Sequence, residues 1–226
     1  MNFFRGNVLR AALLLSIFYA ESADADLSKT VPDPARPDEV LTSKIFYTGT
    51  VTLQKANDLV SALDELNVKY PRLKSIYLYI DSRGGSMSAG QIAYRAIQSS
   101  RVQVITVNLD EVMSAATMMF CGARNRLSFP DAHFLLHAPN EDFGGSFRPD
   151  ELNRMREDVG DLRVMLSDIY GQCTNMDRKE INSITYSENN RERLTPAEAS
   201  VKGMVTGMAH EIVDAPVSYY VKDRAR

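Results

Sequence analysis

The feature that most constrains the fold is a regular alternation of short apolar strands with amphipathic helices in the first half of the chain. We predict strands at 45–47, 75–80 and 102–107, separated by helices at 52–67 and 86–99. The middle strand is apolar enough to be buried on both faces. Because consecutive strand–helix–strand units form right-handed crossovers, this order predicts an α/β fold built on a mainly parallel sheet.

The second half of the chain continues with shorter elements and one long helix. A helix is expected between Ser114 and Gly122. Two short strands are expected at 126–128 and 133–136, followed by a glycine-containing loop at 138–147. A long helix is expected at 150–173 and two shorter helices at 177–183 and 196–202. The sequence holds no internal repeat and no low-complexity tract. We therefore predict one folded domain, residues 43–226.

The first 25 residues have the composition of a secretory leader. Arg5 and Arg10 precede an apolar run at residues 11–20, and the small residues Ala23 and Ala25 follow this run. A positive start, a short apolar core and an A-x-A-like end are typical of a signal peptide. We expect cleavage after Ala25 and export, to a bacterial periplasm. An uncleaved membrane anchor and a buried N-terminal helix remain the alternatives.

Residues 26–42 are expected to form an extended polar lead-in with no folded element, because they contain three prolines and several aspartates. The net charge of −3 and a pI near 5.7 leave no basic footprint for nucleic acid. Cys121 and Cys173 either pair or remain buried thiols, and the sequence does not decide between these states. The sequence contains no CxxC motif and no His/Cys cluster with metal-ligand spacing, so we expect no metal and no cofactor.

Ser114 and His137 are the residues that point to chemistry. Ser114 follows a strand and opens a helix of small residues, where its hydroxyl is exposed on a tight bend and the Ala115 N–H faces the same place. His137 stands at the tip of an apolar strand, and imidazole accepts protons near neutral pH. Taken singly, Ser114 is as well explained as a helix N-cap, and His137 as a structural histidine.

Gly84 and Gly85 supply the third feature, a glycine turn between a buried strand and a helix. Glycines at such a turn allow backbone N–H groups to point into a cleft, although a double glycine is also a common simple turn. Acyl transfer needs a nucleophile, a base and two fixed donors for the oxyanion. Together with Ser114, Ala115 and His137, the turn offers that set at the ends of predicted parallel strands, which favours a serine hydrolase.

These same segments resemble the ClpP family of serine peptidases. Residues 77–86 read YLYIDSRGGS, residues 113–116 read MSAA, residues 136–139 read LHAP, and residues 194–199 read LTPAEA. Each is similar in order and spacing to a characteristic ClpP segment, with Arg83 where the family usually has proline. The resemblance covers the chain from about Ile45 to Asp214. It implies a ClpP/crotonase-like spiral of β-β-α units with a long handle helix at 150–173.

The resemblance also assigns roles to the candidate residues. It implies Ser114 as the nucleophile, His137 as the base and an oxyanion hole formed by the N–H groups of Gly84 and Ala115. Peptide binding would fall to Gly85 and to the loop that carries Gly144 and Gly145, with the loop lying along the substrate as an extended strand.

The third member of the triad is displaced from the family pattern. A gapless alignment places Arg191 where the family has aspartate, and arginine accepts no hydrogen bond from imidazole. We expect Asn190 to accept it through its amide oxygen. Glu188, Asn189 and Glu192 remain open for the same position.

The leading functional hypothesis is an ATP-independent serine peptidase acting on peptides or unfolded segments. An exported chain would work without an unfoldase partner, and the resemblance implies a homo-oligomeric ring. Two alternatives remain, namely a catalytically inactive peptide-binding or scaffold protein and a crotonase-type acyl-CoA enzyme that needs no Ser/His pair.

Overall fold

The computed structural model describes residues 25–30, 36–140 and 144–223. The predicted leader, apart from its last residue, lies outside the described residues. Within the described part, no helix is both long and apolar enough to span a bilayer.

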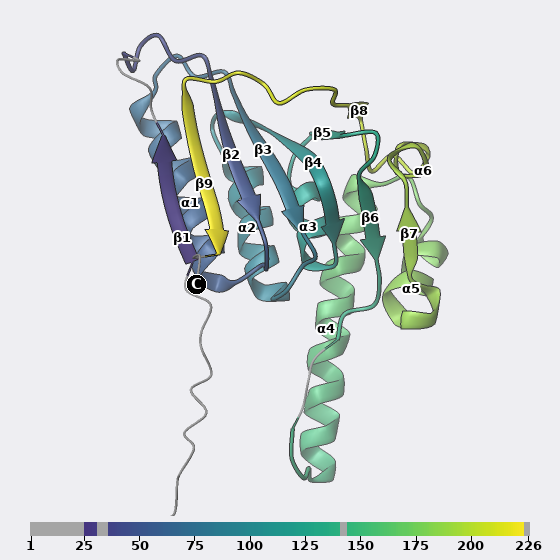
Figure 1. The fold of residues 1–226 in the computed structure, drawn as a ribbon. Helices are drawn as coiled ribbons and strands as arrows, with labels where there is room; N and C mark the ends of the chain where they lie inside the picture. Colours follow the sequence, from purple (N-terminus) through teal and green to yellow (C-terminus); the bar gives the residue numbers. More distant parts are fainter. Residues whose placement is uncertain (1–24, 31–35, 141–143, 224–226) are drawn as a thin grey trace, which may run out of the picture.

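A twisted, mainly parallel sheet forms the centre of the molecule (Figure 1). Its strands run in the order β1-β9-β2-β3-β4-β5-β8, while β6 pairs with β4 and with β7. The bounds of the strands are Ala25–Thr30 (β1), Thr42–Thr48 (β2), Ser75–Ser82 (β3), Gln103–Met113 (β4), Asn125–Ser128 (β5), His133–Leu136 (β6), Glu192–Leu194 (β7), Gly207–Met208 (β8) and Val217–Asp223 (β9). The predicted α/β class with a parallel sheet is confirmed.

Three helices cover one face of this sheet, namely α1 (Leu53–Lys69), α2 (Met87–Ser99) and α3 (Ala115–Cys121) (Figure 1). Each carries an apolar side that packs on the buried strands, and α3 is buried along its whole length. The crossovers β2–α1–β3 and β3–α2–β4 are those expected from the sequence pattern. As a result, the carboxyl ends of β2, β3 and β4 meet at one edge.

Strand β4 is longer than the sequence indicated and serves two partners. Its first part pairs with β5, from Ile105 to Asn108, and its last part pairs with β6, from Glu111 to Met113. The two partners diverge, so β6 carries its own carboxyl end beside the end of β4. This divergence brings the segment after β6 next to the turn that begins α3.

The edge of the sheet departs from the expected lead-in. Residues 26–30 are extended, as predicted, but together with Ala25 they form strand β1, which pairs antiparallel with β9. Strand β9 in turn pairs parallel with β2. The prediction that residues 26–42 form no folded element is therefore wrong for residues 26–30, because their pairing partner β9 is far away in the sequence.

A long helix, α4 (Pro149–Cys173), projects beyond the body of the molecule (Figure 1). Only its carboxyl-terminal half is buried, through Leu166, Ile169, Tyr170 and Cys173. The chain closes with α5 (Arg178–Tyr186), a 3₁₀ turn η1 (Glu188–Asn190) and α6 (Pro196–Val201).

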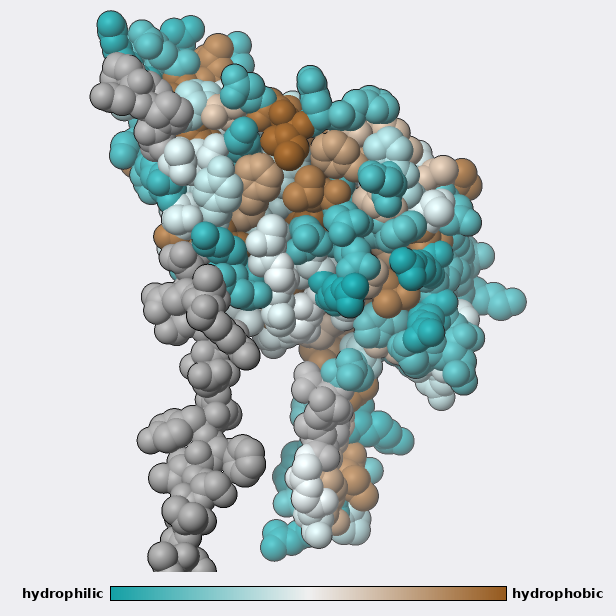
Figure 2. Space-filling view, viewed as in Figure 1, coloured by the Kyte–Doolittle hydropathy of each residue, from teal (hydrophilic) through white to brown (hydrophobic). Residues whose placement is uncertain are grey.

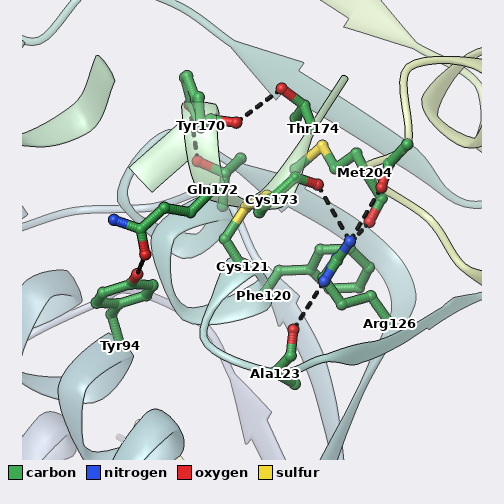
Figure 3. The surroundings of a disulfide bond; sticks show 12 residues. Tyr94, Phe120, Cys121, Ala123, Arg126, Tyr170, Gln172, Cys173, Thr174 and Met204 are labelled. Atoms are coloured by element: carbon green, nitrogen blue, oxygen red, sulfur yellow. Dashed lines mark hydrogen bonds between the residues drawn. A yellow bond between two sulfur atoms is a disulfide. The ribbon is translucent and has the colours of Figure 1, made fainter. Parts of the chain in front are cut away.

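A disulfide and an arginine fix the base of α4 to the body (Figure 3). Cys121 at the end of α3 is bonded to Cys173 at the end of α4, with their Cα atoms 5.4 Å apart. The Arg126 guanidinium donates to the carbonyls of Ala123, Cys173 and Gly203 at 2.9–3.1 Å. These carbonyls lie just beyond or at the ends of three helices, where backbone acceptors lack intrahelical partners. Burial lowers the pKa of Arg126.

The opposite face of the sheet carries a smaller apolar cluster. Tyr79, Ile105, Val107 and Ala209 are buried there, and Phe46 and Tyr220 stack on one another at the edge of this face. Figure 2 shows apolar side chains reaching the surface on this side of the sheet. The sheet is thus covered by helices on one face only, in the part of the chain that the structure describes.

Candidate active site

Ser114 lies at the bend between β4 and α3 with a backbone conformation that is unusual for a side-chain-bearing residue. Its φ is 53° and its ψ is −130°, and among the described residues it alone has a positive φ without being glycine. Its N–H donates to the carbonyl of Leu135 on β6 at 3.0 Å. Such strain persists where the surrounding structure imposes it, and it is concentrated at functional sites. The bend leaves the Ser114 side chain half-buried at the sheet edge.

The predicted N-cap alternative for Ser114 is not what the structure shows, because its side chain makes no cap hydrogen bond to α3. The first N–H groups of a helix have no intrahelical acceptor. The N–H of Ala115, the first residue of α3, is one of these. Thr117 closes the turn instead, since its hydroxyl donates to the Ser114 carbonyl at 2.6 Å and lies 2.8 Å from the buried Tyr170 hydroxyl.

Gly84 packs directly against the Ser114 bend. A Cβ atom at Gly84 would lie 2.6 Å from the Ser114 Cβ, so glycine is required by close approach as well as by its φ of 97°. Its own N–H donates to the Ser82 Oγ at 3.2 Å, and the residue is buried. The Gly84 N–H, predicted as an oxyanion donor, therefore already has an acceptor in this structure.

Gly85 is better placed to donate. It forms a parallel bridge with Val51 in which the bonds are made by its neighbours, Gly84 through its carbonyl and Ser86 through its N–H. In a trans peptide, the N–H points in the direction opposite to the carbonyl of the preceding residue. Gly85 is exposed. Because the Gly84 carbonyl accepts from the Val51 N–H, we infer that the Gly85 N–H of the same peptide points away from Val51. Gly85, which was predicted to bind substrate, thus offers the oxyanion donor that was expected from Gly84.

His137 directly follows β6. Pairing of Val112 with Phe134 and of Met113 with Leu135 sets the register, so the residues after both strands emerge at the same edge. Ser114 is one of these residues and His137 is the other. The His137 side chain is 18% exposed, and its Nδ1 lies 3.2 Å from the Oε2 of Glu188.

Glu188 is the residue that faces His137, and Asn190 is not. The Asn190 side-chain amide donates to the Ser183 carbonyl at 3.2 Å, on the far side of η1. Arg191, which occupies the aligned position, contacts the other carboxylate oxygen of Glu188 at 3.0 Å. The expectation for Asn190 is corrected because the 3₁₀ turn reverses the chain and presents its first residue. A gapless alignment contains no signal for such a turn.

A polar cleft of about 330 Å³ lies beside the glycine turn. Asp81, Asp110 and Glu111 line it, and Arg83 spans it to contact Glu111 at 2.6 Å. Burial raises the pKa of Asp81, and the neighbouring carboxylate of Asp110 adds to the effect. Arg83, which replaces the proline of the family pattern, thus neutralises part of an acidic surface next to the site.

The remaining site predictions lie on the loop before α4. Gly144 and Gly145 are exposed, with no heavy atom within 4 Å of a Cβ built on either one. The described part of this loop contains no strand, and residues 141–143 lie outside the described residues. Among the described residues, no group of His, Cys, Asp or Glu side chains is arranged to hold a metal.

Comparison with known proteins identifies the family of the chain. The Clp protease family profile matches residues 38–212. The "ATP-dependent Clp protease proteolytic subunit 2" of Treponema denticola is 27% identical over 203 residues, which are 88% of this chain and 98% of that protein. The "ATP-dependent Clp protease proteolytic subunit" of Mesostigma viride is 30% identical over 70% of this chain and 67% of that protein.

A solved structure supports the fold. A point mutant of ClpP1 from Listeria monocytogenes superposes with a TM-score of 0.65 at 20% identity, covering 74% of this chain and 91% of that one. The resemblance noted in the sequence motifs is therefore confirmed, and the chain belongs to the Clp protease family.

Proposed function

We propose that this protein is a serine peptidase that hydrolyses peptides and unfolded segments without ATP, through Ser114, His137 and Glu188. The observation that carries the proposal is the strained Ser114 bend beside the His137–Glu188 pair. Family membership supports the reaction class. The roles of the individual residues rest on the geometry described above.

The reaction follows from these positions. His137 takes the Ser114 proton as the hydroxyl attacks the peptide carbonyl, and it later returns a proton to the leaving amine. Glu188 accepts the hydrogen bond from Nδ1–H, which fixes the tautomer that leaves Nε2 free to act as base. The N–H groups of Gly85 and Ala115 bind the oxyanion. Water then releases the acyl group from Ser114 by the same steps in reverse.

A homo-oligomer is the second part of the proposal. The projecting half of α4 presents an apolar stripe of Leu152, Met155, Val159 and Leu162, spaced three or four residues apart. Leu152 is 52% exposed in the single chain. An apolar face of this kind is typical of a helix that packs on another helix. The stripe therefore supports assembly through α4, which would enclose the active sites and restrict entry to unfolded chains.

Export remains a proposal that rests on the sequence of residues 1–25 and on the cysteines. Disulfides persist in oxidising compartments and are rare in the cytosol. The Cys121–Cys173 bond is what an exported protein would retain. Fusion of residues 1–35 to a reporter that is active only after export, with a fusion starting at residue 26 as the control, tests this part. An active reporter whose leader is not cleaved would indicate a membrane anchor.

The two alternative functions are less well supported. A binding or scaffold protein would need no carboxylate next to the His137 imidazole, yet the Glu188 carboxylate contacts its Nδ1. An acyl-CoA enzyme of the same general fold would need neither Ser114 nor His137.

Labelling with a fluorophosphonate probe tests the proposal. The purified oligomer should react once per chain, whereas Ser114→Ala should not react and His137→Ala should react at least about 10³-fold more slowly. His133→Ala, a half-buried histidine at the other end of β6, is the matched control and should react normally. Absence of labelling in the wild-type protein at every assembly state would exclude a serine peptidase.

A further inference from the structure

Strand β9 lies outside the residues that match the family profile, yet it reaches the active-site edge of the sheet. Figure 1 shows β9 between β1 and β2, ending beside the turn that connects β2 to α1. We call residues 48–51 the support turn and residues 82–86 the glycine loop. The support turn lies between the end of β9 on one side and the glycine loop on the other.

Asp223, the last residue of β9, holds the support turn together with a buried lysine. The Lys55 ammonium is 3.1 Å from the Asp223 Oδ1 and donates to the Thr48 carbonyl. The other carboxylate oxygen of Asp223 accepts from the Thr50 N–H at 3.4 Å. Two residues of the support turn, Thr48 and Thr50, are thus bound to one ion pair.

Lys55 has no access to solvent, since its side chain is 1% exposed. Its ammonium lies 4.8 Å from the centre of the Tyr47 ring. Burial lowers the pKa of Lys55, and the carboxylate of Asp223 opposes this shift. A buried charge is costly unless it is paired, so Lys55 depends on Asp223 to remain in place.

The support turn is bonded directly to the glycine loop. The Val51 N–H donates to the Gly84 carbonyl at 2.8 Å, and the Ser86 N–H donates to the Val51 carbonyl at 2.9 Å. The Gly49 N–H donates to the Asp81 carbonyl at 2.9 Å. These bonds fix the peptide planes on both sides of Gly85, and they therefore set the direction of its N–H.

We propose that Asp223 and Lys55 are positioning residues for the peptidase reaction, acting through the support turn on the Gly85 N–H. The inference rests on the proposed function, because it concerns the oxyanion donor of that reaction. It assigns a role in the active site to a strand that the matched family region does not include. Neither Asp223 nor Lys55 touches the reacting atoms.

Substitution should affect the rate of chemistry more than binding. A donor contributes to the transition state only when it is aimed at the developing oxyanion, and displacements of about 1 Å lower rates by up to about 100-fold. Asp223→Ala is therefore expected to lower kcat and the rate of fluorophosphonate labelling by about tenfold or more, with KM within about twofold. Asp223→Asn keeps an oxygen acceptor for Thr50 and should lose less.

A second variant and a matched control complete the set. Lys55→Met removes the ammonium but keeps the apolar stem, and it should reproduce the kcat effect of Asp223→Ala. The double variant should be no slower than the worse single one, because both act through the same turn. Lys222→Ala removes an exposed charge from the adjacent position of β9 and should leave kcat unchanged.

Hydrogen exchange followed by mass spectrometry gives a readout that does not depend on activity. Asp223→Ala should accelerate exchange in peptides covering the support turn and the glycine loop, but not in those covering β4. Faster exchange confined to β9 and the support turn, with an unchanged labelling rate, would overturn the inference. Absence of labelling in the wild-type protein would overturn the proposed function alone, and the exchange of the glycine loop would then decide the coupling by itself.

Discussion

The Nδ1 atom of His137 and the Oε2 atom of Glu188 lie 3.2 Å apart. Because Glu188 is 57% exposed, its carboxylate is more hydrated than a buried triad acid would be. We therefore expect Glu188→Gln to lower kcat for a fluorogenic peptide by about 10- to 100-fold, less than the loss of about 10⁴-fold seen for a buried acid. Steady-state kinetics at neutral pH measure this effect.

Asn190→Ala is the matched control for that experiment, because Asn190 belongs to the same 3₁₀ turn but bonds to Ser183. Its kcat should stay within about twofold of wild type. If Asn190→Ala were slow and Glu188→Gln were normal, the third member of the triad would be Asn190 and the turn would have to rearrange on substrate binding.

Arg191 gives a test of the alignment. Its guanidinium contacts the Oε1 of Glu188 at 3.0 Å, so it holds the carboxylate toward His137. Exposed ion pairs contribute at most about 1 kcal/mol, and Arg191→Ala should lower kcat by no more than about fivefold. Arg191→Asp should lower it further, since the new carboxylate repels Glu188. A rise in kcat for Arg191→Asp would show that the aligned position serves as the acid, and Arg193→Ala controls for loss of a nearby positive charge.

The parts of the fold that the sequence predicted well are those encoded by local patterns. The helical stripe that includes Leu59 and Leu63, and the apolar strand before Asp81, were placed within a few residues of their observed positions. The bend at Ser114 was also predicted, because a polar residue between an apolar strand and a run of small helix formers is typical of a strand-to-helix turn. The order of these elements was sufficient to give a parallel sheet.

The parts that could not be predicted depend on contacts between distant segments. Strands β1 and β9 pair across the whole length of the chain, and β9 was not recognised because its neighbour β2 is far from it in sequence. The Cys121–Cys173 bond required knowing that α3 and α4 end side by side. Glu188 required knowing the path of η1. Local propensity contains none of this information.

Strain at Ser114 predicts a trade-off between stability and activity. A non-glycine residue at positive φ costs about 1–3 kcal/mol, of which glycine recovers a part. We expect Ser114→Gly to raise the free energy of unfolding by about 1 kcal/mol relative to Ser114→Ala. Chemical denaturation of both inactive variants measures the difference. Equal stability would show that the bend is not strained.

The disulfide predicts a redox dependence of stability. It closes a loop of 52 residues, for which the chain-entropy relation gives up to about 4 kcal/mol. Reductant should therefore lower the Tm of the wild-type protein. The Cys121→Ser and Cys173→Ser double variant should start at the lower Tm and show no response to reductant. A Tm of the wild-type protein that is independent of reductant would indicate that the bond does not form in solution.

We expect the attachment of β1 to the body of the molecule to depend on pH. Lys29 on β1 forms an ion pair with Glu65 on α1, and its ammonium lies 5.1 Å from the centre of the Tyr219 ring. Burial alone would raise the pKa of Glu65, but its interactions with Lys29, Tyr219 and Lys69 together outweigh burial, and the pKa is lowered. A carboxylate with a lowered pKa in the folded state stabilises the protein above its unfolded pKa of about 4.3, and this contribution disappears as the pH falls through the folded value.

Glu65→Gln should therefore lower the Tm at neutral pH by up to about 4 °C, and the difference from wild type should vanish toward pH 3. Asp64→Asn, which removes an exposed carboxylate from the next position of α1, should show a smaller difference at neutral pH. A difference between Glu65→Gln and wild type that persisted unchanged at pH 3 would mean that Glu65 acts through packing and not through its charge. In that case Lys29 would hold β1 mainly through its contacts with the aromatic rings of Tyr70 and Tyr219.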